Sequence, residues 1–255
     1  MHLGIVTYNI AANWDLDTLL AKCAALHIEG VELRTTHAHG VEPSLTAAQR
    51  REVRAKFAAS PVTLWGLGSV CEYHSPDTAE LARNIQLSKD FIDLAVDVGA
   101  RGVKVRPNNL PDEVPVERTI RQIGEALRVV GDYAAPRGIE IWVEVHGRKS
   151  AHPPYIARML EIADHPSVSA CWNCNPTDLI DGSIVGSFQL LRPWIKSVHL
   201  HDLTDETYPY RILFGLLHDM NYDRFTLAEI PESSDPDRVL TYYRALWQAY
   251  NDLAG

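Results

Sequence analysis

The sequence lacks the signatures of several protein classes. No run of about 18 apolar residues could span a membrane, and the opening MHLGIVTY has the pattern of a strand rather than of a secretory signal. The chain has no G-x-G-x-x-G and no Walker A motif, so a nucleotide site would lack its usual phosphate-binding loop. No linker, low-complexity tract or short repeat divides it. These absences predict one globular domain over residues 1–255, and we expect a cytoplasmic protein.

Basic charge is also scarce. The 255 residues include 24 Lys and Arg against 33 Asp and Glu, which gives a formal net charge of −9. An acidic surface repels phosphate backbones and anionic membranes, and no run of five basic residues offsets it. The densest basic segment, RREVRAK at 50–56, has the pattern of a solvated helix face. We therefore expect neither a nucleic-acid partner nor a membrane partner.

Cysteine is rare as well, with four residues in the chain. Cys171 and Cys174 form a C-x-x-C, but no second C-x-x-C or His pair at finger spacing accompanies it, so a zinc site is weakly supported. Cys171 falls within a strand-like apolar run. We expect reduced core thiols there, with a redox pair as the alternative.

What the sequence does contain is a repeated alternation of strand and helix patterns. Strict alternation predicts a parallel sheet, and eight units in a chain of about this length predict closure into a (β/α)₈ TIM barrel. An open doubly wound sheet is the alternative. The expected strands are 2–8, 30–34, 61–69, 102–106, 139–145, 168–173, 195–201 and 225–230.

Capping residues predict where several helices begin and end. Asp15 is expected to cap a helix, Thr46 and Gln49 resemble a capping box, and a helix from Ser75–Pro76 should stop at Gly99. Segment 203–224 is expected to be loop-rich, with room for one short helix. The remaining expected helices are 115 to about 137, 152–162, about 183–191 and 235–253.

Polar side chains stand at the expected carboxyl ends of the strands, where barrel active sites lie. The stretch IEIWVEVHG at 139–147 places Glu144 inside an apolar run and His146 two residues later, on the same strand face. A buried carboxylate needs a cation, hydrogen-bond donors or a metal ion. The other polar residues at these ends are Glu32, Arg34, Glu72, His74, Lys104, Arg106, Asn173, Asn175, His199, His201, Asp202 and Glu229.

These residues allow more than one interpretation. Glu32 and Arg34 suit either the site or an ion pair that closes the barrel rim. The two Glu, one His and one Asn on the fifth to eighth strands offer oxygens and an imidazole, which suit Mn²⁺, Mg²⁺, Co²⁺ or Zn²⁺. We expect a divalent metal site, and a metal-free polar site is the alternative.

These residues give the chain a resemblance to the xylose isomerase-like TIM barrels, the superfamily of sugar phosphate isomerases and epimerases. The resemblance rests on GVELR at 30–34, the E-x-H at 144–146, the H-x-x-D at 199–202 and the Glu of the eighth strand, and it covers the order of elements along the whole chain. It implies a divalent metal held by Glu144, Asn173, His199 and Glu229. The family's His precedes an acidic residue by three positions, which selects His199 over His201.

The sixth strand departs from the family pattern. The family usually has Asp there, whereas this chain has Asn173 in CWNCNP. An amide oxygen can bind a metal ion, but it is neutral, so the site would carry one less negative charge. A weaker affinity or a different metal preference would follow.

The resemblance also implies a reaction, which is proton transfer next to a carbonyl through an enediolate. Glu144 and Glu229 would be the catalytic acid and base. The expected substrate is a small sugar, sugar phosphate or polyol-type carbonyl compound, and a homo-oligomer is left open. The candidates for binding the substrate are His146, His201, Lys104, Arg106, His74, Glu32 and Arg211.

Three other functions are weighed against this one. An inosose-dehydratase-like lyase would use the same enolate intermediate. An endonuclease-IV-like phosphodiesterase would need more His and Asp ligands than can be placed, and the net charge disfavours DNA. A non-catalytic carbohydrate-binding barrel would follow if Asn173 abolished metal binding.

Overall fold

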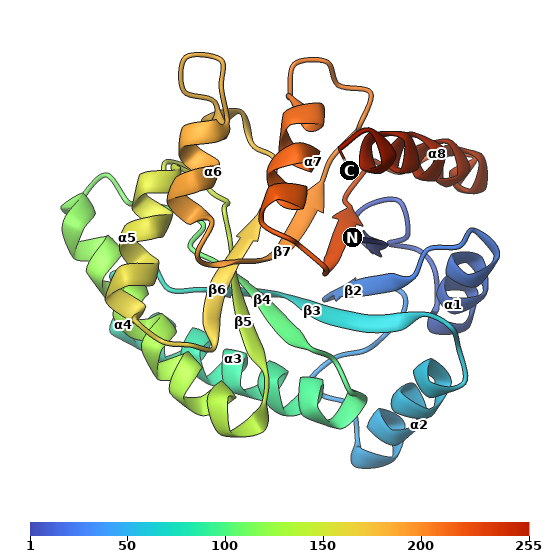
Figure 1. The fold of residues 1–255 in the computed structure, drawn as a ribbon. Helices are drawn as coiled ribbons and strands as arrows, with labels where there is room; N and C mark the ends of the chain where they lie inside the picture. The colour runs from blue at the N-terminus through green and yellow to red at the C-terminus, as the bar shows by residue number, and fades with distance from the viewer. Residues whose placement is uncertain (255) are drawn as a thin grey trace.

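The fold is a closed barrel of parallel strands surrounded by helices (Figure 1). The structure is a computed structural model and describes residues 1–254. Over these residues eight strands pair in chain order, and β8 closes the barrel against β1. The predicted (β/α)₈ barrel is therefore confirmed, and the open sheet is excluded.

The strands and helices alternate as the sequence predicted. The strands are β1 His2–Val6, β2 Gly30–Arg34, β3 Thr63–Glu72, β4 Gly102–Arg106, β5 Glu140–Glu144, β6 Val168–Trp172, β7 Ile195–Leu200 and β8 Phe225–Ala228. The α-helices are α1 Leu16–Ala25, α2 Ala47–Ala58, α3 Thr78–Val98, α4 Val116–Ala134, α5 Pro153–Ala163, α6 Val185–Leu191, α7 Tyr210–Asp219 and α8 Pro236–Ala254. Two short 3₁₀ turns are η1 Ala135–Arg137 and η2 Pro176–Asp178.

Most of the predicted helix caps are observed. The Asp15 side chain accepts a hydrogen bond from the Thr18 amide, and Thr46 forms the expected capping box with Gln49. Gly99 ends α3 with φ 85°, a left-handed conformation that glycine adopts without steric cost. These local signals fix helix ends because they satisfy backbone groups that a helix leaves without partners.

One predicted helix start needs correction, and the helix allowed for in segment 203–224 is present. Helix α3 begins at Thr78 rather than at Ser75–Pro76, because the Asp77 carboxylate accepts the Ala79 amide and becomes the N-cap. Segment 203–224 contains a helix of ten residues, α7. Its N-cap residue, Pro209, makes no side-chain capping bond, so no capping pattern marks where α7 begins. Its buried face supplies the stabilisation instead.

Aromatic side chains fill the barrel interior below the polar end. The indoles of Trp65 and Trp142 stack with ring centroids 5.0 Å apart, within a buried cluster that includes Phe225. A Cβ at Gly66 or Gly102 would come within 2.5 or 2.6 Å of the Trp142 ring, so glycine is required beside it. This packed layer closes the barrel interior beneath the carboxyl ends of the strands.

A helix that crosses a bilayer needs about 20 mostly apolar residues. No helix within residues 1–254 is both long enough and apolar enough to cross a membrane.

The cysteines lie in the interior. All four are buried free thiols, including Cys171 and Cys174. Burial raises the pKa of both of these thiols. They are therefore neutral, as expected for reduced core residues rather than reactive ones.

Candidate metal centre and substrate cavity

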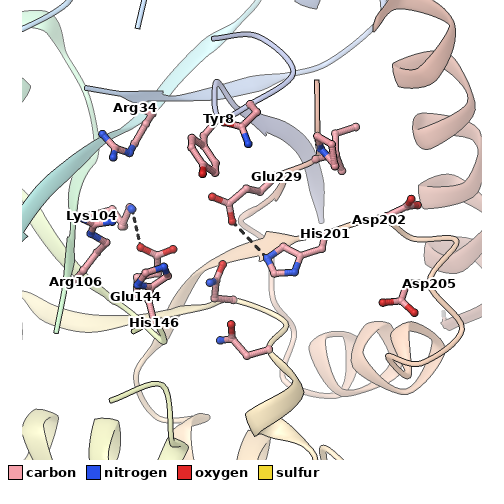
Figure 2. Close-up of a pocket in the computed structure, with 15 residues that line it drawn as sticks. Tyr8, Arg34, Lys104, Arg106, Glu144, His146, His201, Asp202, Asp205 and Glu229 are labelled. Atoms are coloured by element: carbon pink, nitrogen blue, oxygen red, sulfur yellow. Dashed lines mark hydrogen bonds and ion pairs between the residues drawn. The ribbon is translucent and has the colours of Figure 1, made fainter. Parts of the chain in front are cut away.

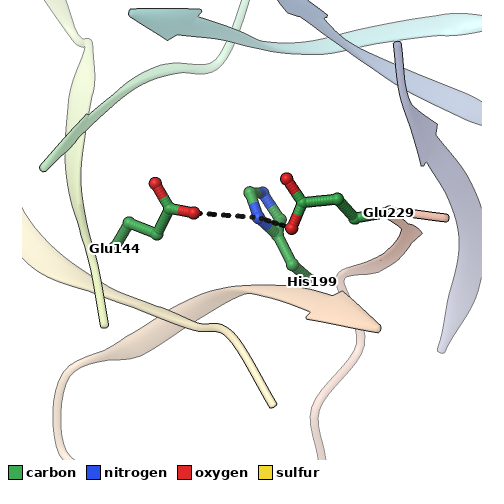
Figure 3. A group of neighbouring side chains, drawn as sticks. All are labelled: Glu144, His199 and Glu229. Atoms are coloured by element: carbon green, nitrogen blue, oxygen red, sulfur yellow. Dashed lines mark ion pairs between the residues drawn. The ribbon is translucent and has the colours of Figure 1, made fainter. Parts of the chain in front are cut away.

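Three side chains meet at the carboxyl end of the barrel. Glu144 is the last residue of β5, His199 lies near the end of β7, and Glu229 follows β8 directly. Each offers one ligand atom, and these atoms all lie within 4.8 Å of one another (Figure 3). His199 Nδ1 is 3.4 Å from Glu229 Oε2 and 3.8 Å from Glu144 Oε1. An imidazole nitrogen between two carboxylates is a donor set that divalent transition metals bind.

A buried carboxylate beneath the cluster orients His199. Glu32 is fully buried on β2, and its Oε2 lies 3.2 Å from His199 Nε2. This contact turns the other ring nitrogen, Nδ1, toward Glu144 and Glu229, where it has no hydrogen-bond partner among the described residues. Metal-binding histidines are typically held this way by a carboxylate on the second nitrogen. Glu32 therefore contacts His199, whereas the sequence suggested a substrate contact or an ion pair with Arg34.

Asn173 adds a fourth donor to the same region. It directly follows β6, is 3 % exposed and lines one cavity together with Glu144 and Glu229. Within the described chain its Oδ1 accepts no hydrogen bond. Because buried polar atoms are nearly always paired, two unpartnered donor atoms near two carboxylates fit a metal-ligand set. The residues present therefore fit the divalent metal ion that the sequence implied.

Charges around the cluster keep its carboxylates ionised. Burial raises the pKa of Glu144, but the ammonium group of Lys104, 2.7 Å from Oε2, together with His199 and His146 outweighs burial and lowers that pKa. Burial likewise opposes ionisation of Glu229, yet His199 and its other neighbours hold the pKa of Glu229 well below its usual value. Both groups are thus bases that are charged at neutral pH and largely shielded from water.

The groups around His199 shift its pKa upward, opposite to the shifts of the two carboxylates. Burial would lower the pKa of its imidazole, but Cys171, Glu32 and Glu229 outweigh burial and raise that pKa well above its usual value. The surroundings of His199 therefore favour a positive charge. A divalent cation satisfies that preference more completely than a proton, because it also interacts with both carboxylates.

The cluster lies in a polar cavity of about 500 Å³ (Figure 2). That volume falls within the range of small-molecule sites. Of the predicted substrate contacts, His146, His201, Lys104 and Arg106 line it. The complete lining is Tyr8, Asn9, Arg34, Lys104, Arg106, Glu144, His146, Asn173, Asn175, His201, Asp202, Asp205, Glu229, Ile230 and Pro231.

Besides Glu32, two predicted contacts lie outside the lining. His74 is outside the lining, with Nδ1 3.6 Å from Glu72 Oε2. Glu72 also accepts a hydrogen bond of 2.8 Å from Arg106 Nη2, so the three side chains form one polar network in which Arg106 lines the cavity and Glu72 and His74 do not. Arg211 is exposed on the first turn of α7. The structure brings neither His74 nor Arg211 to the cavity.

Other lining residues were missed from the sequence. Tyr8 and Asn9 follow β1, so the rule that selects residues after strands would have found them. Asp205 lies in the loop after β7, where its carboxylate accepts the Thr207 amide. Its place at the cavity depends on the path of that loop, for which the sequence has no signal.

Comparisons with known proteins agree with this architecture. Among solved structures, L-ribulose 3-epimerase has a TM-score of 0.85 at 15% identity, covering 100% of this chain and 96% of that chain. The IOLI protein with a bound zinc atom has a TM-score of 0.81 at 14% identity, covering 100% and 99%. The probable 3-DHS dehydratase AsbF from Bacillus anthracis has a TM-score of 0.76 at 14% identity, covering 97% and 99%. Identities this low show a shared fold.

At the level of sequence, the chain matches a family model but no curated protein. A search of curated proteins finds no match to the chain. The family model described as xylose isomerase-like TIM barrel matches residues 20–246. Because that match spans most of the sequence, the chain belongs to the xylose isomerase-like TIM barrel family.

Proposed function

We propose that the protein is a divalent-metal-dependent isomerase or epimerase of a small sugar-like carbonyl substrate. The observation that carries this proposal is the pair of ionised carboxylates, buried Glu144 and partly buried Glu229, on either side of His199 in a cavity lined by polar side chains. Proton transfer next to a carbonyl needs a base that is charged and held close to the substrate. The family supports an enzyme of this general kind.

The metal ion would be held by Glu144, Asn173, His199 and Glu229. When bound, it would supply a Lewis acid that polarises the substrate's carbonyl oxygen and stabilises the negative charge that develops there. Glu32 would keep His199 oriented for this role through its contact with Nε2. The chain's own groups would carry the protons.

Glu144 and Glu229 would move the protons. Their lowered pKa values keep both carboxylates able to accept a proton at neutral pH. One of them would take the proton from the carbon next to the carbonyl, and the other would return a proton to the opposite face of the same carbon in an epimerase. Their positions on different strands, β5 and β8, give access to the substrate from two directions. Lys104 would hold Glu144 in its charged form.

A dehydratase is the second candidate, and His201 is the observation that favours it. His201 Nε2 lies 3.5 Å from Glu229 Oε2 at the cavity wall. A protonated imidazole there could protonate a leaving hydroxyl group after the same first proton abstraction. The net reaction would then be loss of water to give an α,β-unsaturated carbonyl product. Measuring the ultraviolet absorbance of that product separates the two candidates.

Turnover of a ketose panel in D₂O tests the proposal. We expect metal content near one equivalent after mild purification, loss of turnover after chelation, and deuterium at the carbon next to the carbonyl. The matched control is Glu125→Gln, which alters an exposed glutamate on α4 and should behave as wild type. Product that forms without any deuterium would indicate a hydride shift and remove the proton-transfer role. Protein without metal and without turnover would support a carbohydrate-binding barrel.

A further inference from the structure

The cavity contains a guanidinium group that forms no ion pair with a carboxylate among the described residues. Lys104 pairs with Glu144 at 2.7 Å, and Arg106 pairs with Glu72 at 2.8 Å. Arg34, at the end of β2, donates from Nη1 to the Thr35 carbonyl oxygen at 3.0 Å. It forms no ion pair with any carboxylate in residues 1–254, although it lines the same cavity. Among the arginine and lysine side chains of the lining, Arg34 is therefore the one that is available to pair with an anionic ligand.

The surroundings of Arg34 make an anionic partner energetically favourable. The side chain is partly buried, and burial together with the nearby Arg106 lowers the pKa of Arg34. An arginine keeps its proton under such conditions, so the cost of its charge remains. An anion beside it would reduce both the desolvation cost and the repulsion from Arg106.

Charge is distributed unevenly around the cavity. Arg34, Lys104 and Arg106 lie on one side of it, and Asp202 and Asp205 lie on the other (Figure 2). The carboxylates of Glu144 and Glu229 lie between these two sides. A ligand that spans the cavity would therefore meet cationic donors at one end and the carboxylates of Glu144 and Glu229 at its middle. At its other end, its hydroxyl groups could donate hydrogen bonds to the carboxylates of Asp202 and Asp205.

We propose that Arg34 binds an anionic group of the substrate, and that the substrate is a polyhydroxy compound bearing a carboxylate or a phosphate rather than a neutral sugar. This proposal rests on the proposed function, because it names the substrate class of the same cavity. A guanidinium binds either oxyanion through paired N–H···O bonds, so the shared chemistry is a planar or tetrahedral oxyanion at the β2 side. The hydroxyl groups of the ligand would then face Asp202 and Asp205.

Calorimetric titration of the metal-loaded protein tests the assignment with three probes: D-gluconate, D-glucose 6-phosphate and neutral D-glucitol. A hydrogen bond to a charged group contributes enough for a preference of about 10-fold or more. We expect at least one anion to bind that much more tightly than glucitol. Tight binding of gluconate alone identifies a carboxylate substrate, and tight binding of glucose 6-phosphate alone identifies a phosphate substrate.

Three variants locate the anion. Arg34→Gln should abolish the preference while leaving the metal content unchanged, and Arg34→Lys should restore part of it because the charge returns without the paired geometry. Arg83→Gln, which changes an exposed arginine on α3, is the matched control and should keep the full preference.

Three results would overturn the assignment: equal binding of glucitol and both anions, an anion preference that survives in Arg34→Gln, or no binding of either anion. Failure of the proposed function is distinguishable from these results. It would appear as absent metal or absent deuterium exchange, whereas the charge preference is measured by binding alone. Conversely, deuterium exchange on a neutral sugar with no anion preference would preserve the reaction and reject the role of Arg34.

Discussion

Strand β5 carries a buried glutamate at each of its ends, and the two have very different surroundings. Glu140, at the amino end, accepts hydrogen bonds from Arg101, Arg224 and the Trp142 indole at 2.7 to 3.0 Å. Glu144, at the carboxyl end, accepts one from Lys104, and its other neighbours are His199 and a second carboxylate, Glu229. Both carboxylates lie in the barrel interior and are almost fully buried.

The difference is the one expected between a structural carboxylate and one that would bind a ligand. Around Glu140 every oxygen has donors, and although burial raises its pKa, Arg224, Trp142 and Arg101 outweigh that effect and lower the pKa to about 2. Around Glu144 the Nδ1 of His199 and the Oδ1 of Asn173 have no partner within the described chain. A satisfied network stabilises the fold, whereas an unsatisfied one is completed by a ligand.

The largest effect is expected at the amino end. Glu140→Gln should reduce the free energy of unfolding by about 3 kcal/mol at pH 7, because the folded-state pKa of about 2 lies far below the ordinary 4.5. A depressed carboxyl pKa contributes stability that is present above pH 4.5 and is lost as pH falls toward 2. Urea unfolding of wild type and variant should therefore differ at pH 7 and converge over that window.

The control for this experiment is Glu125→Gln on the exposed face of α4, which should leave stability within about 0.5 kcal/mol of wild type. The metal content of Glu140→Gln should match that of wild type, because the two ends of β5 are separated by the aromatic layer. A stability difference that does not shrink below pH 4.5 would mean that Glu140 contributes by packing rather than by charge.

The same substitution at the carboxyl end should have the reverse pattern. Glu229→Gln should lower turnover at least about 10²-fold, the loss expected for a general base, and should clearly reduce metal content. Its loss of unfolding free energy in the presence of chelator should be smaller than that of Glu140→Gln, because Glu229 contacts two histidines but no arginine or lysine within 4.0 Å in the described chain. Full activity in both Glu229→Gln and Glu144→Gln would make the carboxylates structural and remove the distinction between the two ends.

Glu32 tests whether an orienting carboxylate matters as much as a ligand. Glu32→Gln should weaken metal affinity by about 10-fold, because the contact that holds Nε2 of His199 changes from a carboxylate to an amide. Affinity can be measured by competition with a chromophoric chelator, and turnover at saturating metal should recover more fully than in Glu229→Gln. An unchanged affinity would show that the packing of β7 alone fixes the His199 ring.

The fold and the convergence of Glu144, His199 and Glu229 at the candidate site could be predicted because both follow from short-range rules. Strand alternation points Glu144, His199 and Glu229 into the barrel, and parallel strands bring their carboxyl ends together. Gly99 and the capping box at Thr46 marked helix ends for equally local reasons. A single residue and its near neighbours carried each of these signals.

The remaining features depend on contacts between distant segments. Glu32 lies 167 positions before His199, so its partner could not be read from the residues beside it. Asp205 reaches the cavity through the course of a loop, and α7 forms because it buries an apolar face that includes Leu213 and Phe214 without a capping signal. Arg34 was visible as a strand-end residue, but its lack of a carboxylate partner among the described residues appears only once Glu32 is seen to contact His199.

The smallest effect is expected at Asn173, where the substitution should strengthen metal binding rather than weaken it. Asn173→Asp adds a negative charge to a donor set that already contains Glu144 and Glu229, and it should tighten divalent metal binding by about 10-fold. Asn9→Asp adds the same charge elsewhere on the cavity lining, so it controls for the general field and should change affinity much less. If both variants tighten binding equally, the cavity's charge rather than coordination by residue 173 sets the affinity. If Asn173→Asp binds metal no better than wild type, the Asn173 oxygen is not a ligand, and the metal set contracts to Glu144, His199 and Glu229.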